Sequence, residues 1–197
     1  MRRVVCSLAL VVGLLSPVLA RGATWEVDPA HSQIAFSVRH MMISTVHGQF
    51  RTFSGAATGD PASPASATIE ASIDVASIDT GNEKRDGHLK SADFFDVEKF
   101  PKMTFKSKKI EAAGAGKFKV TGDLTLHGVT KEVVLDVEGP SAPVTMMGAL
   151  RSGAHATTKI HRKDFGIEWN KSMDGGGVVV GDDVDVTIDV EAAKKGE

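Results

Sequence analysis

Apolar and polar residues alternate along most of the chain, which is the pattern of β-strands with one buried face. The clearest example spans residues 67–75, where five apolar side chains alternate with Thr, Glu, Ser and Asp. The same pattern returns near the C-terminal end, at residues 183–191. We predict further strands at residues 33–39, 49–58, 103–111, 118–126, 133–137 and 153–160. The alternation therefore predicts an all-β protein of about eight strands.

Clusters of glycine and proline separate the predicted strands, as turns between antiparallel strands require. They lie at residues 59–61 with Pro64, at 114–116, at Gly128, at 139–140 with Pro143, and at 175–177. Only residues 82–100 interrupt the alternation, with four charged residues followed by Leu89 and the pair Phe94 and Phe95. We predict a short helix there, packed over one end of the strands. Because no other segment suits a crossover helix, a parallel sheet is not expected.

Strands with one apolar face can hide it in two ways, by pairing two sheets or by closing one sheet into a barrel. Closure also removes exposed strand edges. A barrel with its apolar face toward an outer membrane would need aromatic girdles at both interfaces, and the chain has no Tyr and only Trp25 and Trp169 as Trp. The alternation alone leaves the sandwich and the closed barrel open.

The first twenty residues have the parts of a cleavable signal peptide. Arg2 and Arg3 precede an apolar run at residues 4–15, and a small residue, Ala20, ends the segment. The run is shorter than the roughly 20 apolar residues of a membrane-spanning helix. We predict export of the chain, with cleavage after Ala20.

Cleavage after Ala23 is the alternative, but it would place Arg21 three residues before the cut, where a small side chain is usual. The predicted organisation is a signal peptide at residues 1–20 and one domain at residues 21–197. Cys6, the only cysteine, lies in the predicted signal peptide. The mature domain is therefore expected to fold without a disulfide.

The charge of the chain argues against two classes of partner. The formal net charge is −2 at pH 7, and it becomes more negative when Arg2 and Arg3 are removed. A mildly acidic chain without basic runs is not expected to bind nucleic acid. The mature chain also has no stretch apolar enough to span a bilayer, so we do not expect an integral membrane protein.

No residue pattern predicts a metal site, a cofactor or a catalytic group. The seven histidines form no close ligand pair on one element; His155 and His161 are six residues apart. The chain has no Gly-x-Ser-x-Gly motif, and Val178 follows the glycines at 175–177 where a phosphate-binding loop needs Lys. Arg85 and Asp86 have two interpretations, either helix-start contacts or polar groups over a ligand head.

The predicted interior is rich in Ala, Val and Ile, with methionines as adaptable packing groups. Because these side chains are small, such a lining favours a void over a filled core. The natural occupant of a long dry void is an alkyl or polyisoprenyl chain, because each buried CH₂ contributes about 0.8 kcal/mol.

Eight short motifs follow one another along the chain: WEVDPAHS at 25–32, FSVRH at 36–40, VHGQF at 46–50, IDTG at 78–81, RDGHL at 85–89, DFFDVEKFP at 93–101, TGDLTLHG at 121–128 and DFG at 164–166. This series resembles the YceI-like family of polyisoprenoid-binding periplasmic proteins. Each is weak alone, but together they cover nearly all of the mature chain. Lys163 departs from the family, whose members often carry Ser before the residue that matches Asp164.

The resemblance implies a lipocalin-like, eight-stranded, antiparallel up-and-down β-barrel with a short helix over one end, located in the periplasm. It implies a ligand that is an isoprenoid quinone, a polyprenyl phosphate or another long-chain amphiphile. It brings no catalytic residues. Which lipid is bound does not transfer, because members of the family differ in ligand.

We predict three groups of binding residues from the expected strand faces. Nine residues are expected to line the apolar tail channel: Ile34, Phe36, Val38, Phe50, Ile73, Met103, Phe105, Leu124 and Leu126. Phe94 and Phe95 are expected to close one end. Arg39, His40 and Arg51 are candidates to meet a polar head, since cations favour an anionic group, but ordinary surface placement suits them equally.

Three hypotheses for function follow. The first is a periplasmic carrier or reservoir for an isoprenoid lipid, without turnover. The second is a structural or stress-related barrel protein without a ligand. The third is an enzyme that acts on a lipid head with His40 or His88 as base. A homodimer is compatible with each, and the sequence decides neither the oligomeric state nor whether the role is transport, storage or stress protection.

Overall fold

The computed structural model describes residues 22–146 and 148–196. The predicted signal peptide, with Cys6 and the predicted cleavage site after Ala20, lies outside the described residues. The strands are β1 (Thr24–Val27), β2 (Gln33–His40), β3 (Ser44–Phe50), β4 (Phe53–Thr58), β5 (Thr68–Asp74), β6 (Ile78–Asp79), β7 (Lys102–Gly114), β8 (Lys117–Leu126), β9 (Val129–Glu138), β10 (Val144–Met146), β11 (Ala149–His161) and β12 (Val180–Lys194). The helices are α1 (Glu83–Lys90) and four short 3-10 helices, η1 (Pro29–His31), η2 (Pro64–Ser66), η3 (Val75–Ser77) and η4 (Arg162–Phe165).

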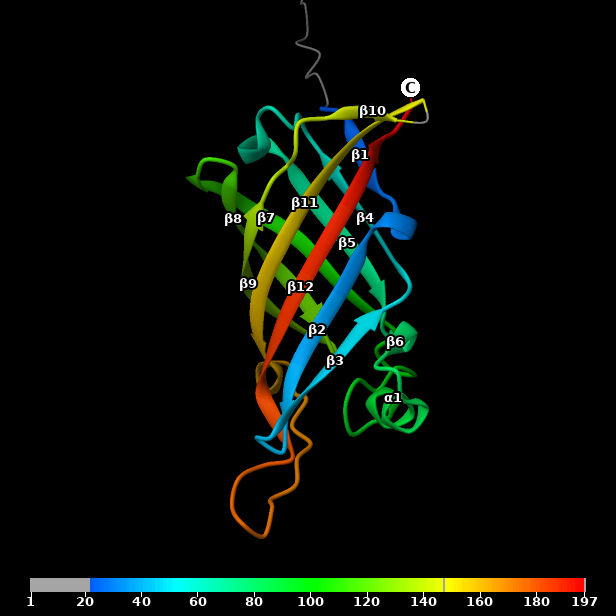
Figure 1. The fold of residues 1–197 in the computed structure, drawn as a ribbon, viewed down its shortest axis with the longest axis vertical. Helices are drawn as coiled ribbons and strands as arrows, with labels where there is room; N and C mark the ends of the chain where they lie inside the picture. The colour runs from blue at the N-terminus through cyan, green and yellow to red at the C-terminus, as the bar shows by residue number, and fades with distance from the viewer. Residues whose placement is uncertain (1–21, 147, 197) are drawn as a thin grey trace, which may run out of the picture.

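The strands form a closed antiparallel barrel, because β11 pairs with both β9 and β12. Around the ring the order is β11, β9, β8, β7, β5, β4, β1 and β12. The long strand β12 pairs with β1 near its C-terminal end and with β2 nearer its start, and β2 pairs in turn with β3 (Figure 1). The predicted eight-stranded antiparallel barrel is confirmed, and the sandwich alternative is excluded.

Alternation along each strand decides which side chains enter the barrel. In β8, Val120, Leu124 and Leu126 are buried, while Lys117 and Lys119 are exposed on the outer face of the strand. A one-residue shift would turn every one of these side chains to the other face. Full burial of each such apolar side chain is worth roughly 1.5–3 kcal/mol, which fixes the register.

Helix α1 occupies the first half of the segment where a helix was predicted and lies at one end of the barrel (Figure 1). Asn82 caps it, since its side-chain oxygen accepts a hydrogen bond from the Arg85 backbone N–H at 3.0 Å. Arg85 Nε donates to Thr80 Oγ1 at 2.7 Å, and Asp86 accepts from the Thr80 backbone N–H at 3.0 Å. These two residues therefore hold the junction between β6 and α1, which is the helix-start interpretation of the pair.

The predicted strand at residues 49–58 is wrong as one continuous strand. The chain breaks into β3 and β4 at Arg51 and Thr52, whose backbone N–H groups donate to Ser77 O at 3.1 Å and Ser77 Oγ at 3.0 Å. Those bonds replace the strand ladder at the turn from one strand into the next. Strand β1 was not predicted, because four residues are too few to show a period of two.

No helix in residues 22–146 and 148–196 has the length and apolar character needed to cross a bilayer.

Candidate functional site in the barrel interior

The barrel encloses a cavity of about 390 Å³. Gly59 and Pro61, in the turn between β4 and β5, line it at one end, whereas Phe94 and Ile167 line it at the end nearest α1. These ends are separated by the length of β5, seven residues or roughly 20 Å. The volume falls within the range of about 300–1,000 Å³ that is usual for small-molecule sites.

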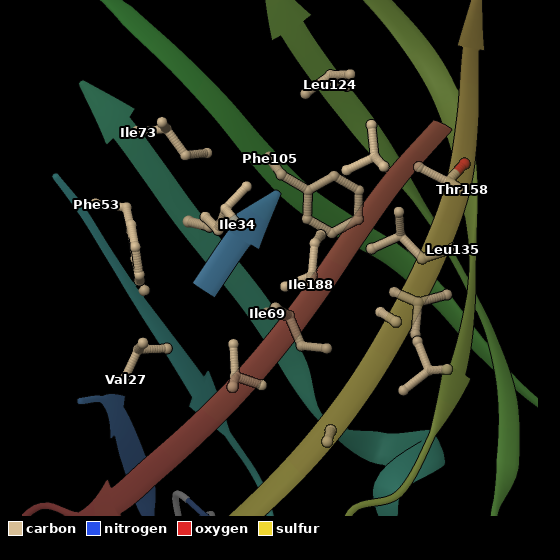
Figure 2. Close-up of a pocket in the computed structure, with 18 of the residues that line it drawn as sticks. Val27, Ile34, Phe53, Ile69, Ile73, Phe105, Leu124, Leu135, Thr158 and Ile188 are labelled. Atoms are coloured by element: carbon tan, nitrogen blue, oxygen red, sulfur yellow. The ribbon is translucent and has the colours of Figure 1, made fainter. Parts of the chain in front are cut away.

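The cavity wall is almost entirely hydrocarbon. Figure 2 shows aliphatic and aromatic side chains that project inward from strands around the whole ring, among them Ile34, Ile69, Phe105, Leu135 and Ile188. Small residues on the same wall leave the space open, and these are Gly55, Ala57, Ala71, Ala154 and Ala156. An apolar cavity of about 150 Å³ already binds benzene, so this larger one suits an apolar chain.

All eleven residues that the sequence predicted for the apolar tail lie on this wall. They are Ile34, Phe36, Val38, Phe50, Ile73, Phe94, Phe95, Met103, Phe105, Leu124 and Leu126. For the nine that lie in strands, the inward placement follows from the period of two, whereas Phe94 and Phe95 lie in the turns between α1 and β7. Their contact with a ligand stays a prediction.

Aromatic side chains form the wall at the α1 end. Phe94 is 6% exposed and packs against Trp169 and His88, with ring centroids 5.1 and 5.0 Å away. His88 Nε2 lies 2.8 Å from Asp93 Oδ2, which orients the imidazole ring. Phe95 packs edge-on against Phe50 at 6.1 Å. This cluster places the aromatic rings of Phe94 and Phe95 at one end of the cavity.

The three residues predicted for a polar head do not line the cavity. Arg39 donates to Thr45 Oγ1 at 3.1 Å and to the Met42 carbonyl at 2.9 Å, on the outer surface. Arg51 pairs with Asp79 at 2.7 Å, also outside the barrel. His40, the last residue of β2, is half-buried but is absent from the cavity wall. The geometry gives no support to a head group at these residues, so that role stays a prediction.

Arg162 is a cavity residue that sequence reasoning missed. It is 4% exposed and donates to the carbonyls of Gly181, Ile167 and Trp169 at 3.0, 2.8 and 2.9 Å. Its Nη2 also pairs with Asp182 at 3.0 Å. Burial lowers the pKa of the guanidinium, and the Asp182 carboxylate opposes that shift. Two of these hydrogen bonds thus tie Arg162 to the loop between β11 and β12, which lies at the α1 end, and the other two tie it to the start of β12.

Trp25 is the second residue that was missed as part of the site. It is 5% exposed, lies on β1 and lines the cavity. Its strand is too short to predict which face points inward. In the structure Trp25 pairs with Ala57 and Val27 pairs with Ala192, and these four residues all line the cavity. The family motif at residues 25–32 is the only signal in the sequence that could have pointed to it.

A charged cluster outside the barrel joins η1 and its cap to β11 and β12. Asp28, His31 and Glu191 offer ligand atoms within 4.8 Å of one another, a spacing that would suit a cation. However, the Arg151 guanidinium already pairs with Asp28 at 2.7 Å and with Glu191 at 2.5 Å. The hydrogen bond from Arg151 is the main reason that the pKa of Asp28 lies well below its usual value. The cluster is therefore an ion-pair network that ties the junction of β1 and η1 to β11 and β12.

Comparisons with known proteins agree with this architecture. The family model described as the YceI-like domain matches residues 25–192. A UPF0312 protein of Vibrio cholerae serotype O1 strain M66-2 is 37% identical over 170 residues, covering 85% of this chain and 90% of that protein. The crystal structure of Burkholderia cenocepacia BcnA aligns with a TM-score of 0.72 and 28% identity, covering 84% of this chain and 98% of BcnA.

A second similar structure is described as a polyisoprenoid binding domain from Saccharophagus degradans. It aligns with a TM-score of 0.64 over 88% of this chain and 99% of that domain, and its 19% identity shows a shared fold. The match to the family model spans nearly all described residues. The chain belongs to the YceI-like family.

Proposed function

We propose that this protein is a periplasmic binding protein that carries a long-chain isoprenoid lipid inside its barrel. The observation that carries the proposal is the cavity of about 390 Å³ with an apolar wall along the length of β5. The polyisoprenoid binding domain with the same fold supports the choice of lipid class.

Binding in such a cavity draws its free energy from burial of the chain. Each CH₂ that leaves water contributes about 0.8 kcal/mol, so an alkyl chain of ten carbons gains roughly 8 kcal/mol before the costs of association. The aromatic wall at Phe94 and Phe95 and the inward Ile, Val and Leu side chains provide contacts for this chain. The affinity then depends on chain length more than on any single polar contact.

The two alternatives fit the interior less well. A structural barrel without a ligand would fill its core with side chains, whereas the small residues Ala71, Ala154 and Ala156 leave this one hollow. An enzyme would need a base that reaches the ligand, but His40 and His88 both lie off the cavity wall. We therefore propose binding without turnover.

The test is to purify the protein from its own periplasm and to measure the mass of the complex by native mass spectrometry. We expect one copy of the chain, or each copy of a homodimer, to retain one lipid whose extracted mass fits an isoprenoid series. Absence of any retained lipid, together with no uptake of added isoprenoid quinone or polyprenyl phosphate by the purified protein, would refute the proposal.

The compartment is tested separately. Fractionation of the source cells should place the protein in the periplasmic fraction, and N-terminal sequencing should begin at Arg21. A protein that begins at Met1 and stays in the cytoplasmic fraction would contradict the proposed location without bearing on lipid binding.

A further inference from the structure

We propose that the Trp25 indole N–H donates a hydrogen bond to an uncharged, acceptor-bearing head of the bound lipid, such as a quinone carbonyl. This inference rests on the proposed function, and it adds the chemical class of the head and its position in the barrel. It places the head at the end of the cavity far from α1, with the tail directed toward Phe94.

The indole N–H is a buried donor without an acceptor in the protein. Trp25 is 5% exposed and lines the cavity, yet no N or O atom of the described residues accepts a hydrogen bond from its Nε1. A buried donor without an acceptor costs about 1–3 kcal/mol, so most such donors in proteins have a partner. An oxygen atom on a molecule inside the cavity would provide that partner.

The other buried or half-buried polar side chains on the wall are already engaged. The Ser152 hydroxyl donates to the Ser141 carbonyl at 2.8 Å, and the Thr158 hydroxyl donates to the Val134 carbonyl at 2.8 Å. Arg162 makes four hydrogen bonds, two to loop carbonyls and two to Gly181 and Asp182 of β12. Among the described buried residues of the wall, the Trp25 N–H is thus the donor left for a ligand.

The charges on the wall favour a neutral head. The charged residues that line the cavity are Asp60, Glu70 and Arg162. The positive charge of Arg162 is matched by Asp182, and Glu70 pairs with Lys106 at 2.8 Å. Lys194, opposite Trp25 in the strand register, is exposed and does not line the cavity. A phosphate would therefore enter a site where no described cation on the wall is free to pair with it.

The position of Trp25 decides the orientation of the lipid. Its partner in the strand register is Ala57, one residue before the end of β4 and close to the turn at Gly59 and Pro61. This turn and helix α1 lie at opposite ends of β5 (Figure 1). A head that bonds to Trp25 leaves the hydrocarbon end of the barrel, lined by Phe94 and Phe95, to the tail.

The experiment compares three probes that share one isoprenoid tail: a benzoquinone, a monophosphate and the hydrocarbon without a head. Dissociation constants are measured for the parent protein, for Trp25→Phe, which keeps an aromatic ring but lacks the N–H, and for Trp169→Phe at the opposite end. We expect Trp25→Phe to weaken benzoquinone binding about two- to tenfold, the effect of one hydrogen bond. Hydrocarbon binding should stay unchanged, and Trp169→Phe should not weaken benzoquinone binding selectively.

A spectroscopic measurement separates the hydrogen bond from a change in packing. In a ¹⁵N-labelled sample, the indole N–H signal of Trp25 is identified by its absence from the Trp25→Phe spectrum. We expect benzoquinone to shift this signal downfield and the hydrocarbon to shift it much less. Urea unfolding of both variants checks that each is folded in the titrations.

The outcomes separate the inference from the proposed function. If all probes bind the parent and Trp25→Phe equally well, or if Trp25→Phe weakens all three equally, the hydrogen bond is refuted while lipid binding stands. Tighter binding of the monophosphate than of the benzoquinone would refute the neutral head. If no probe binds the parent, the proposed function itself fails.

Discussion

Two glycines in the barrel wall make room for aromatic rings that cover their backbone. A Cβ placed on Gly48 would overlap the ring of Phe36, and one on Gly122 would lie 2.5 Å from Phe105 Cζ and 2.6 Å from the Lys106 carbonyl oxygen. Because the second neighbour is backbone, Gly122 cannot gain a side chain by a simple rotation of the ring. We expect Gly122→Ala to lower the free energy of unfolding by about 1–3 kcal/mol, measured by urea denaturation.

Gly175→Ala is the matched control for this prediction. Gly175 lies in the loop between η4 and β12 and has open space where a Cβ would be placed. We expect this variant to stay within about 0.5 kcal/mol of the parent. Equal stability of Gly122→Ala and Gly175→Ala would show that the wall relaxes around Gly122 and that the ring contact is not limiting.

The sequence predicts which face of a strand each wall residue occupies, but it does not predict the partners of the charged residues. A period of two fixes which side chains share a face, and this is sufficient for Ile34, Phe105 and Leu124. It does not say that Arg51 pairs with Asp79 outside the barrel, since that contact joins strands far apart in the chain. Arg162 escaped prediction because arginine is seldom buried, and only the folded loop supplies its carbonyl partners.

At the scale of elements, α1 depends on its cap more than on its own sequence. It spans eight residues, has a glycine at position 87 and has no buried residue. Isolated helices of this length are marginal in water, so the Asn82 side-chain bond to Arg85 N–H matters. We expect Asn82→Ala to lower the free energy of unfolding by about 1 kcal/mol, measured by urea denaturation.

Asn82→Asp tests the cause of that loss. The aspartate side chain can accept the same hydrogen bond and adds a negative charge at the helix N-terminus, where it is favourable. We expect it to keep the stability of the parent. A loss as large as that of Asn82→Ala would assign the effect to the side-chain amide group and not to the cap.

The junction of β1 and η1 gives the protein part of its sensitivity to acid. The Asp28 carboxylate accepts from Arg151 at 2.7 Å and from the Ala30 N–H at 3.0 Å, which hold its pKa well below the usual 3.8. Its contribution to stability is therefore complete above about pH 4 and is lost as the pH falls toward the lower pKa of the folded state. We expect Asp28→Asn to flatten the decline of the urea midpoint between about pH 4 and pH 2.

Part of the decline should remain in Asp28→Asn, because Asp79, Glu138 and Asp182 also have lowered pKa values. Arg151→Met provides the cross-check, since it removes the main cause of the shift and should flatten the curve in the same pH range. A decline in Asp28→Asn as steep as that of the parent would contradict the assignment.

The break between β3 and β4 shows what element prediction lacked. Residues 49–58 alternate well enough to suggest one strand, but the backbone at Arg51 and Thr52 bonds to Ser77, a residue more than twenty positions away. A local pattern cannot anticipate such a distant partner. Strand β1 was missed for a different reason, because its four residues are too few to show a period of two and only its pairing with β12 and β4 defines it.

At the scale of the whole molecule, closure of the ring creates one interior whose volume decides whether a ligand fits. Ala156 is 8% exposed and faces this interior, between Ile188 and Val137 on the neighbouring strands. We expect Ala156→Leu to occupy space that the lipid tail needs. In urea denaturation, an isoprenoid quinone at 100 times its dissociation constant should stabilise the parent by about 2.7 kcal/mol and the variant by much less. Thr157 is the exposed neighbour of Ala156 on β11, so the quinone should stabilise Thr157→Leu as much as the parent. Equal stabilisation of the parent and Ala156→Leu would place the lipid outside the barrel.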